Sequence, residues 1–123
     1  MLMIGTIVKH DAERLTALAR IDSENPLLDQ GRLPGHAGLE LIAQASGLFL
    51  GLVFKGKARP GAIVAVRDMQ VRQPWLNVDA DITVETGLMG GDENAAMFRG
   101  SVMVAGEPAV EATLMVSPFP GGE

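Results

Sequence analysis

One glutamate in an otherwise apolar stretch is the residue whose position most suggests chemistry. Glu40 lies between Leu39 and Leu41 in residues 38–54, which contain no proline and no other charged side chain. Burial raises the pKa of a carboxyl group toward neutrality, where such a group can act as a general acid or base. A glutamate at the rim of the fold, where a helix begins, would instead be exposed. Spacing alone leaves both possibilities open for Glu40.

Two further polar side chains stand at four-residue spacing from this glutamate. His36 lies four residues before Glu40, and Gln44 lies four residues after it. If a helix already begins at His36, the three side chains share one face, with a drift of about 40° per step. His36 and Glu40 would then form an acid–base pair, and Gln44 would hold the carboxylate. For His36 alone, a capping or solvent-facing role after Pro34 and Gly35 is the favoured interpretation.

A stripe of small residues runs along the same segment. Ala43, Gly47 and Gly51 recur every four residues, and each glycine inside a helix costs about 1 kcal/mol relative to alanine. Two glycines on one face therefore indicate that another backbone or a ligand approaches closely. Packing against a sheet is the favoured explanation. The functional alternative is an acyl chain or pantetheine arm lying along the helix, in which case Gly47 contacts the substrate.

The surrounding residues indicate the elements that position this stretch. Residues 38–54 are apolar on nearly every side, which predicts a buried helix. Before it, residues 1–9 and 15–21 are expected to form a hairpin and residues 22–35 a loop. After it, strands are expected at 62–71, 78–88, 95–104 and 109–116, with a tight hairpin at residues 105–108. This order predicts an α+β fold in which an antiparallel sheet wraps around one long central helix. Uncovered sheet edges predict pairing across a two-fold axis, as a homodimer or a larger homo-oligomer.

Length and composition limit the classes of function. The chain has 123 residues, 47% of them hydrophobic, which predicts one domain over residues 1–117 and a flexible tail at 118–123. There is no cysteine and there are only two histidines, so we expect neither a disulfide nor a metal site, and no cofactor motif is found. Ten basic and fifteen acidic residues give a net charge of −5 without a basic cluster, which does not favour nucleic acid. The lack of a signal-peptide pattern and of a membrane-spanning apolar run predicts a cytoplasmic protein.

Several short motifs, taken in order, resemble hot-dog-fold enzymes described as predicted 3-hydroxyacyl-acyl carrier protein dehydratases. Residues 25–45 carry the strongest likeness, because helices of that family typically open with Leu-Pro, then Gly-hydrophobic-Glu, and continue to Ala-Gln. Downstream, the similar elements are Arg59-Pro60-Gly61, Val66-Arg67-Asp68 and the closing hairpin over residues 106–114. The likeness spans most of the chain and implies a hot-dog fold of the thioester dehydratase and thioesterase superfamily.

The resemblance implies roles for individual positions. Glu40 matches the helix carboxylate that works on the leaving hydroxyl, and Gly38 is similar to the glycine whose backbone N–H polarises the thioester carbonyl. The acyl thioester, carried on acyl carrier protein or coenzyme A, would lie between the helix and a neighbouring subunit. Typical dehydratases also carry a histidine in the loop before the helix, and residues 22–35 contain none. Either His36 takes over the role of the base, or the dehydratase activity is lost or altered.

Three functions are therefore expected to compete. The leading one is dehydration of a 3-hydroxyacyl thioester to the trans-2-enoyl thioester, with Glu40 as general acid or base. A thioesterase that uses Glu40 to activate water is the first alternative, and a non-catalytic acyl-binding or scaffold subunit is the second. Docking of an acidic carrier protein would require a basic patch, for which Arg59, Arg67 and Arg72 are available. Ordinary strand-surface charge is the favoured explanation for these three arginines.

Overall fold

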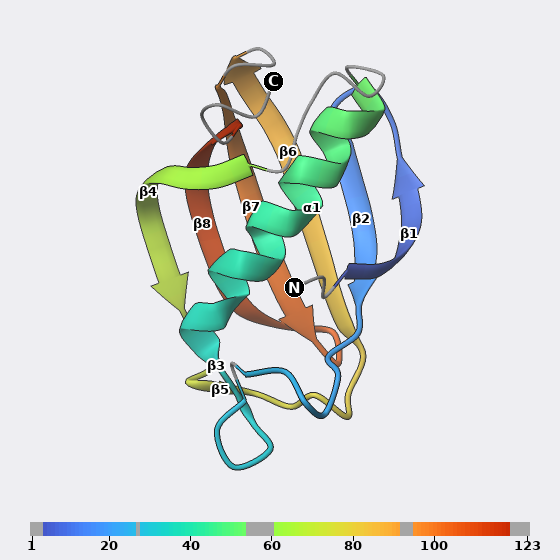
Figure 1. Ribbon diagram of the computed structural model, residues 1–123, viewed down its shortest axis with the longest axis vertical. Coiled ribbons are helices and arrows are strands. Elements are labelled where there is room, and N and C mark those ends of the chain that lie inside the picture. Colours follow the sequence, from blue (N-terminus) through green and yellow to red (C-terminus); the bar gives the residue numbers. More distant parts are fainter. Residues whose placement is uncertain (1–3, 27, 54–60, 92–94, 119–123) are drawn as a thin grey trace.

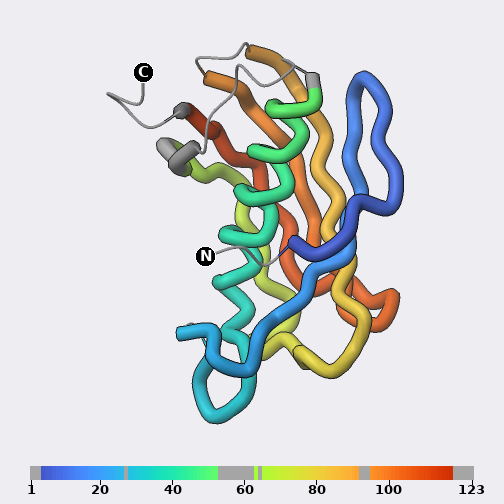
Figure 2. Tube along the Cα trace, turned by 45° about the vertical axis from the view of Figure 1, so that its right-hand side comes forward, coloured from blue at the N-terminus to red at the C-terminus, as the bar shows by residue number. Residues whose placement is uncertain are grey.

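One helix lies across one face of a six-stranded antiparallel sheet. The computed structural model describes residues 4–26, 28–53, 61–91 and 95–118. The helix α1 (Gly38–Val53) follows a single turn of 3-10 helix, η1 (Gly35–Ala37). The sheet curves around α1, so that the helix lies in the hollow of the sheet (Figures 1 and 2).

The strands follow one another in the sheet in the order β1-β2-β6-β7-β8-β4, which leaves β1 and β4 as its edges. Their bounds are β1 (Ile4–His10), β2 (Arg14–Ala19), β4 (Gly61–Val71), β6 (Ile82–Gly91), β7 (Ala96–Val104) and β8 (Glu107–Pro118). Two further strands, β3 (Leu33–Pro34) and β5 (Trp75–Leu76), pair with each other near the start of the helix (Figure 1). In the part of the chain that the structure describes, no helix is long and apolar enough to cross a membrane.

The predicted α+β fold with one central helix is confirmed, and the helix begins at the predicted residue. It ends at Val53, and Phe54, the last residue of the predicted helix, lies outside the described residues. The predicted tail also lies largely outside them, except that Pro118 is the last residue of β8. The two-residue strands β3 and β5 were not predicted, because two residues are too few to show a period.

The strand predicted over residues 78–88 begins four residues later than expected, at Ile82. Asn77 forms a turn just before it. The Asn77 side-chain oxygen accepts the Asp79 N–H at 3.0 Å, and its backbone carbonyl accepts the Ala80 N–H at 3.2 Å. Asparagine favours such turns because its short side chain imitates a backbone carbonyl. This turn keeps residues 78–81 out of the sheet.

Two tight turns hold the ends of the long strands. Asp11 accepts the backbone N–H groups of Glu13 and Arg14 at 2.8 and 3.0 Å, and these hydrogen bonds hold the pKa of the Asp11 carboxyl below its usual value. Between β7 and β8, Ala105 and Gly106 have φ angles of 52° and 81°. Two successive left-handed residues match the twist of a two-residue hairpin. The hairpin predicted over residues 105–108 is thereby confirmed.

The helix approaches the middle of the sheet at a glycine. Gly100 of β7 lies under Ile42, and a Cβ atom added to this glycine would overlap the Ile42 side chain. Two turns further along, Phe49 meets Phe98 edge to face, with ring centroids 5.8 Å apart. The buried Ser46 hydroxyl donates to the Ile42 carbonyl at 2.8 Å and lies 2.8 Å from the Thr86 hydroxyl on β6. Close packing and one satisfied polar pair thus fix the helix over β6 and β7.

Two glycine substitutions test this packing in opposite directions. We expect Gly100→Ala to lower the free energy of unfolding by about 1–3 kcal/mol, because the added methyl displaces Ile42 from a tightly packed site. Gly47→Ala should raise the free energy of unfolding by up to about 1 kcal/mol, since alanine is the better helix former. Apart from the helix's own nearby backbone, no described atom lies within 4 Å of the new methyl. Urea unfolding of the two variants and the parent measures both changes. Equal stability of Gly100→Ala and the parent would contradict the packing described.

Candidate functional site

Glu40 lies on the face of α1 that points away from the sheet. It is the third residue of the helix, and its side chain is exposed, whereas its neighbours Leu41 and Ile42 are fully buried against the strands. The spacing in the sequence left open whether the Glu40 side chain is buried or exposed. Within a single chain it is exposed. The Gln44 amide nitrogen lies 3.5 Å from a carboxylate oxygen of Glu40, at the outer limit of a hydrogen bond. The structure therefore brings Glu40 and Gln44 together.

His36 lies in η1, before the α-helix begins, and its side chain is exposed. The condition for a shared face, an α-helix that already starts at His36, is not met. Among the described residues, His36 forms neither a hydrogen bond nor an ion pair with Glu40. The four-residue spacing from His36 to Glu40 thus spans two kinds of helix and does not by itself align the side chains.

Gly38 marks the point where η1 passes into α1. Its backbone N–H donates to the carbonyl oxygens of Gly35 and His36, so the N–H expected to polarise a thioester carbonyl already has backbone partners in this conformation. The lack of a side chain has a packing reason. A Cβ atom on Gly38 would lie 2.7 Å from a methyl carbon of Val110 on β8, closer than real Cβ contacts.

The glycine stripe does not pack against the sheet. Apart from the helix's own nearby backbone, no described atom lies within 4 Å of a Cβ atom placed on Gly47 or Gly51. The favoured explanation, packing of these glycines on the strands, is therefore wrong. They lie instead on the side of the helix that carries the exposed Glu40, and we call the residues Glu40, Ala43, Gln44, Gly47 and Gly51 the open face of α1.

An uncovered part of the sheet lies on the same side as the helix. Val66 and Val71 of the edge strand β4 are 40% and 43% exposed. They pair in register with the buried residues Leu114 and Val110 of β8, so they lie on the sheet face that carries α1. Exposed apolar side chains on an unpaired edge strand are typical of a surface that is covered by a partner. Sequence patterning did not single out these two valines, because an alternating strand has the same pattern whether or not the helix covers it.

The short sheet of β3 and β5 supports the start of the helix. The Arg32 guanidinium lies 4.1 Å from the centre of the Trp75 ring, a cation–π contact. The Gly35 N–H donates to the Pro74 carbonyl at 2.7 Å. Trp75 is half-buried on β5. These contacts fix the turn from which Gly38 and Glu40 follow.

The packing role of Gly38 can be separated from any role of its N–H. We expect Gly38→Ala to lower the free energy of unfolding by about 1–3 kcal/mol, because the new methyl overlaps Val110. In the background of Val110→Ala the same change should cost much less, since the obstructing methyl groups are gone, and the coupling between the two sites should be about 0.5–3 kcal/mol. Urea unfolding of the parent, both single variants and the double variant gives this coupling. Strictly additive losses would contradict the contact.

Comparisons with known proteins identify the family and the fold of the chain. A family model described as ApeP dehydratase, of the ApeP-like family, matches residues 1–119. Comparison with curated proteins finds no match.

Solved structures share the fold. The dehydratase heterocomplex ApeI:P from Xenorhabdus doucetiae superposes with a TM-score of 0.87 and 20% identity, over 99% of this chain and 86% of that one. A hypothetical thioesterase with coenzyme A from Streptococcus pneumoniae has a TM-score of 0.67 and 14% identity, over 92% and 84%. Zebra fish thioesterase superfamily member 2 has a TM-score of 0.67 and 11% identity, over 92% and 80%. The expected hot-dog fold is confirmed, and the match over residues 1–119 shows that the chain belongs to the ApeP-like dehydratase family.

Proposed function

We propose that the chain acts on acyl thioesters and that its reaction is the dehydration of a 3-hydroxyacyl thioester, with Glu40 as general acid or base. The observation that carries this proposal is the open face of α1. Its one carboxylate, at Glu40, is followed along the helix by positions without side-chain bulk at Gly47 and Gly51. An extended acyl-pantetheine chain needs such a path, free of side chains, that begins at a proton-transferring group.

The chemistry requires two proton movements. A base removes a proton from C2 of the acyl chain, the C2–C3 double bond forms, and the C3 hydroxyl leaves as water after it gains a proton. We assign the second movement to Glu40, whose carboxyl would reach the C3 hydroxyl, and the Gln44 amide, 3.5 Å away, would orient it. His36 is the candidate for the base within this chain. A base supplied across an interface is the other source.

A second subunit would complete the binding site. The open face of α1 and the exposed Val66 and Val71 lie on one side of the molecule, beside the unpaired edge of β4. Pairing through that edge would cover the two valines and close the path along the helix. The ApeI:P structure is that of a heterocomplex, so a related hot-dog chain is a suitable partner as well as a second copy.

The carrier of the acyl group is acyl carrier protein or coenzyme A. Of the arginines available for docking an acidic carrier, Arg67 is exposed on β4. Arg72 donates to Gln70 at 2.6 Å and to Glu111 at 3.3 Å, so part of its guanidinium already binds side chains of this chain. Arg59 lies outside the described residues. Arg67 is therefore the arginine that best supports docking of a carrier protein.

A thioesterase reaction is the second candidate, and the exposure of Glu40 favours it. A carboxylate that is open to solvent can activate a water molecule against the thioester carbonyl without any second base. Detection of the released thiol from acyl-coenzyme A distinguishes this hydrolysis from dehydration, which leaves the thioester intact. A non-catalytic acyl-binding or scaffold subunit would give neither product.

The central substitution is Glu40→Gln. The amide keeps the shape of the side chain but transfers no proton, so we expect turnover to fall by about 10²–10⁴-fold with the fold unchanged. Absorbance of the enoyl product from 3-hydroxyacyl substrates of several chain lengths measures the activity. Full activity of Glu40→Gln would rule out this mechanism for either reaction.

His36→Ala shows whether the histidine is the base. A loss comparable to that of Glu40→Gln identifies His36 as the proton acceptor. If His36 only faces solvent, activity and stability should both stay close to those of the parent, because its exposed side chain forms no capping hydrogen bond among the described residues. Activity and urea unfolding measured on the same preparation separate the two outcomes.

The path along the helix is tested at Gly47. We expect Gly47→Leu to lower kcat/KM at least about tenfold, or about 1.4 kcal/mol, because its side chain fills the path along the helix about two turns beyond Glu40. The matched control, Gly47→Ala, adds one methyl group and should keep most of the activity. Assays with short and long acyl substrates measure both variants. Unchanged kcat/KM of Gly47→Leu for the long substrates would show that the acyl chain does not follow the helix.

A further inference from the structure

The sheet face opposite α1, which we call the outer face, carries its charges in two rows. Side chains that are opposite each other in register form rows that cross the strands. One row is basic, with arginines on β2, β7 and β4, and the next is acidic, with glutamates on β6 and β8. From β2 to β4 the basic row is Arg14, Gly87, Arg99, Thr113 and Arg67, and the acidic row is Thr16, Glu85, Ser101, Glu111 and Gln70.

Long and short side chains alternate within these two rows. On β2, β6, β7 and β8, a long charged side chain in one row is matched by a small residue in the other, as with Arg99 and Ser101 on β7. The edge strand β4 differs, because it has Arg67 in one row and Gln70 in the other. A hollow of about 370 Å³ lies over two of the small residues, Gly87 and Ser101, and its lining includes Glu85 and Arg99. The outer face is thus a set of projecting charges separated by recesses.

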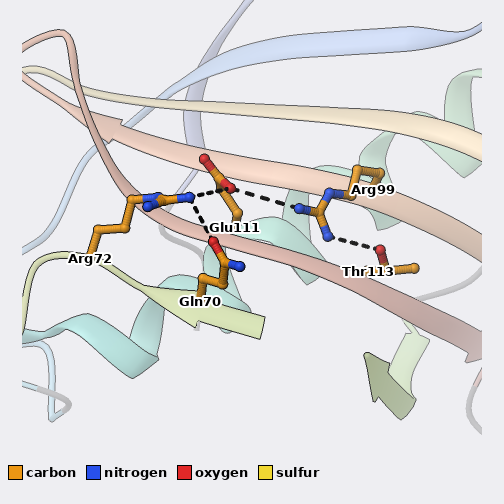
Figure 3. Close-up of polar contacts among 5 residues, drawn as sticks. All are labelled: Gln70, Arg72, Arg99, Glu111 and Thr113. Atoms are coloured by element: carbon orange, nitrogen blue, oxygen red, sulfur yellow. Dashed lines mark hydrogen bonds and ion pairs between the residues drawn. The ribbon is translucent and has the colours of Figure 1, made fainter. Parts of the chain in front are cut away.

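The projecting side chains are held in place by one another. Figure 3 shows Glu111 between Arg72 and Arg99, at 3.3 and 3.7 Å, while Arg99 also donates to the Thr113 hydroxyl at 3.0 Å. Arg14 lies 3.5 Å from Glu85. Exposed pairs of this kind add little to stability. They do restrict the rotamers of the charges, which lowers the entropy lost when a partner binds.

Apolar residues border the charged rows on both sides. Beyond the basic row, Met97 pairs with Met115, and beyond the acidic row, Met103 is followed across the sheet by Thr83 and Leu18. The three methionines are half-buried and Leu18 is 39% exposed. Along the strand direction the outer face therefore has four successive rows of side chains, which are apolar, basic, acidic and apolar.

This order is complementary to itself under a two-fold rotation. Consider an axis that lies in the plane of the face, parallel to the rows and midway between the two charged rows. A rotation by 180° about this axis places the basic row of a second copy over the acidic row of the first. The same rotation places one apolar border over the other. On four of the five strands the long charged side chain then faces a small residue on the same strand of the other copy: Arg14 faces Thr16, Glu85 faces Gly87, Arg99 faces Ser101, and Glu111 faces Thr113. On the edge strand β4, Arg67 faces Gln70.

We propose that the outer face binds the outer face of a second copy of this chain, with Arg99 of each copy inserted over Ser101 of the other, between its Glu85 and Glu111. Four rows on five strands cover about 20 Å by about 19 Å. That footprint is at the low end of interface sizes, so the association depends on concentration. Aligned packing of two sheets is a common arrangement. The contact is separate from pairing through the β4 edge and from the open face of α1.

Sedimentation of the full chain over a wide concentration range tests the contact. Arg99→Glu places like charges together, and Ser101→Trp fills the recess without changing the charge, so both should halve the mass of the largest species. Arg20→Glu makes the same change of charge beside the sheet, and Ser23→Trp adds the same bulk in an exposed loop. These two controls should sediment as the parent does. Added salt should weaken the association of the parent, because the charged rows are screened.

Chemical-shift mapping of the parent provides a test that needs no variant. Amide signals of Glu85, Arg99 and Ser101 should shift with protein concentration, whereas those on the open face of α1 should not follow the same curve. Circular dichroism shows whether each variant is folded. An unchanged mass of both Arg99→Glu and Ser101→Trp, or concentration-independent signals from the outer face, would overturn the proposal. Association of the outer face with a different protein only, and not with a second copy, would overturn it as well.

Discussion

The close approach of the helix to the sheet is the constraint on which the rest of the structure depends. Gly100 lets Ile42 lie directly on β7, and Gly38 lets the first turn of the helix lie on Val110. At both places a single methyl group would separate the two layers. Because packed interiors tolerate little extra volume, these glycines fix the height of the helix, and the hydrogen-bonded pair of Ser46 and Thr86 fixes its position along β6.

The same packing decides what the helix leaves uncovered. Once Leu41, Ile42, Ala45 and Phe49 are buried against the strands, the positions on the opposite side of the helix must point outward. The helix therefore presents Glu40 at one end of its open face, with the glycines beyond it. Sheet curvature leaves this face beside the exposed valines of β4. The molecule therefore has two chemically different faces. The open face of α1 carries a single carboxylate, and the outer face of the sheet carries ordered rows of charged side chains.

Much of this architecture could be predicted from local patterns. The apolar stretch without proline predicted the helix from Gly38, and the Ala105-Gly106 pair predicted the last hairpin, because both signals lie within a few consecutive residues. The direction of the glycine stripe could not be predicted. Gly47 and Gly51 have the same spacing whether they meet the sheet or open space, and only the packing of their neighbours decides. The change from 3-10 to α-helix after Ala37 could not be predicted either, since it depends on the support that Pro74 and Trp75 give to the turn. The charge rows depend on the register of five strands, which no single stretch of sequence contains.

The central claim is that an acyl thioester lies along the open face of α1 with its reacting carbons at Glu40. A crystal structure with a stable 3-hydroxyacyl-pantetheine amide tests it most directly, because both ends of the ligand can be located. The account predicts that the C3 hydroxyl lies within hydrogen-bond distance of the Glu40 carboxylate and that the rest of the ligand passes Gly47 and Gly51. A ligand bound on the outer face of the sheet, or along the helix with its hydroxyl remote from Glu40, would contradict it.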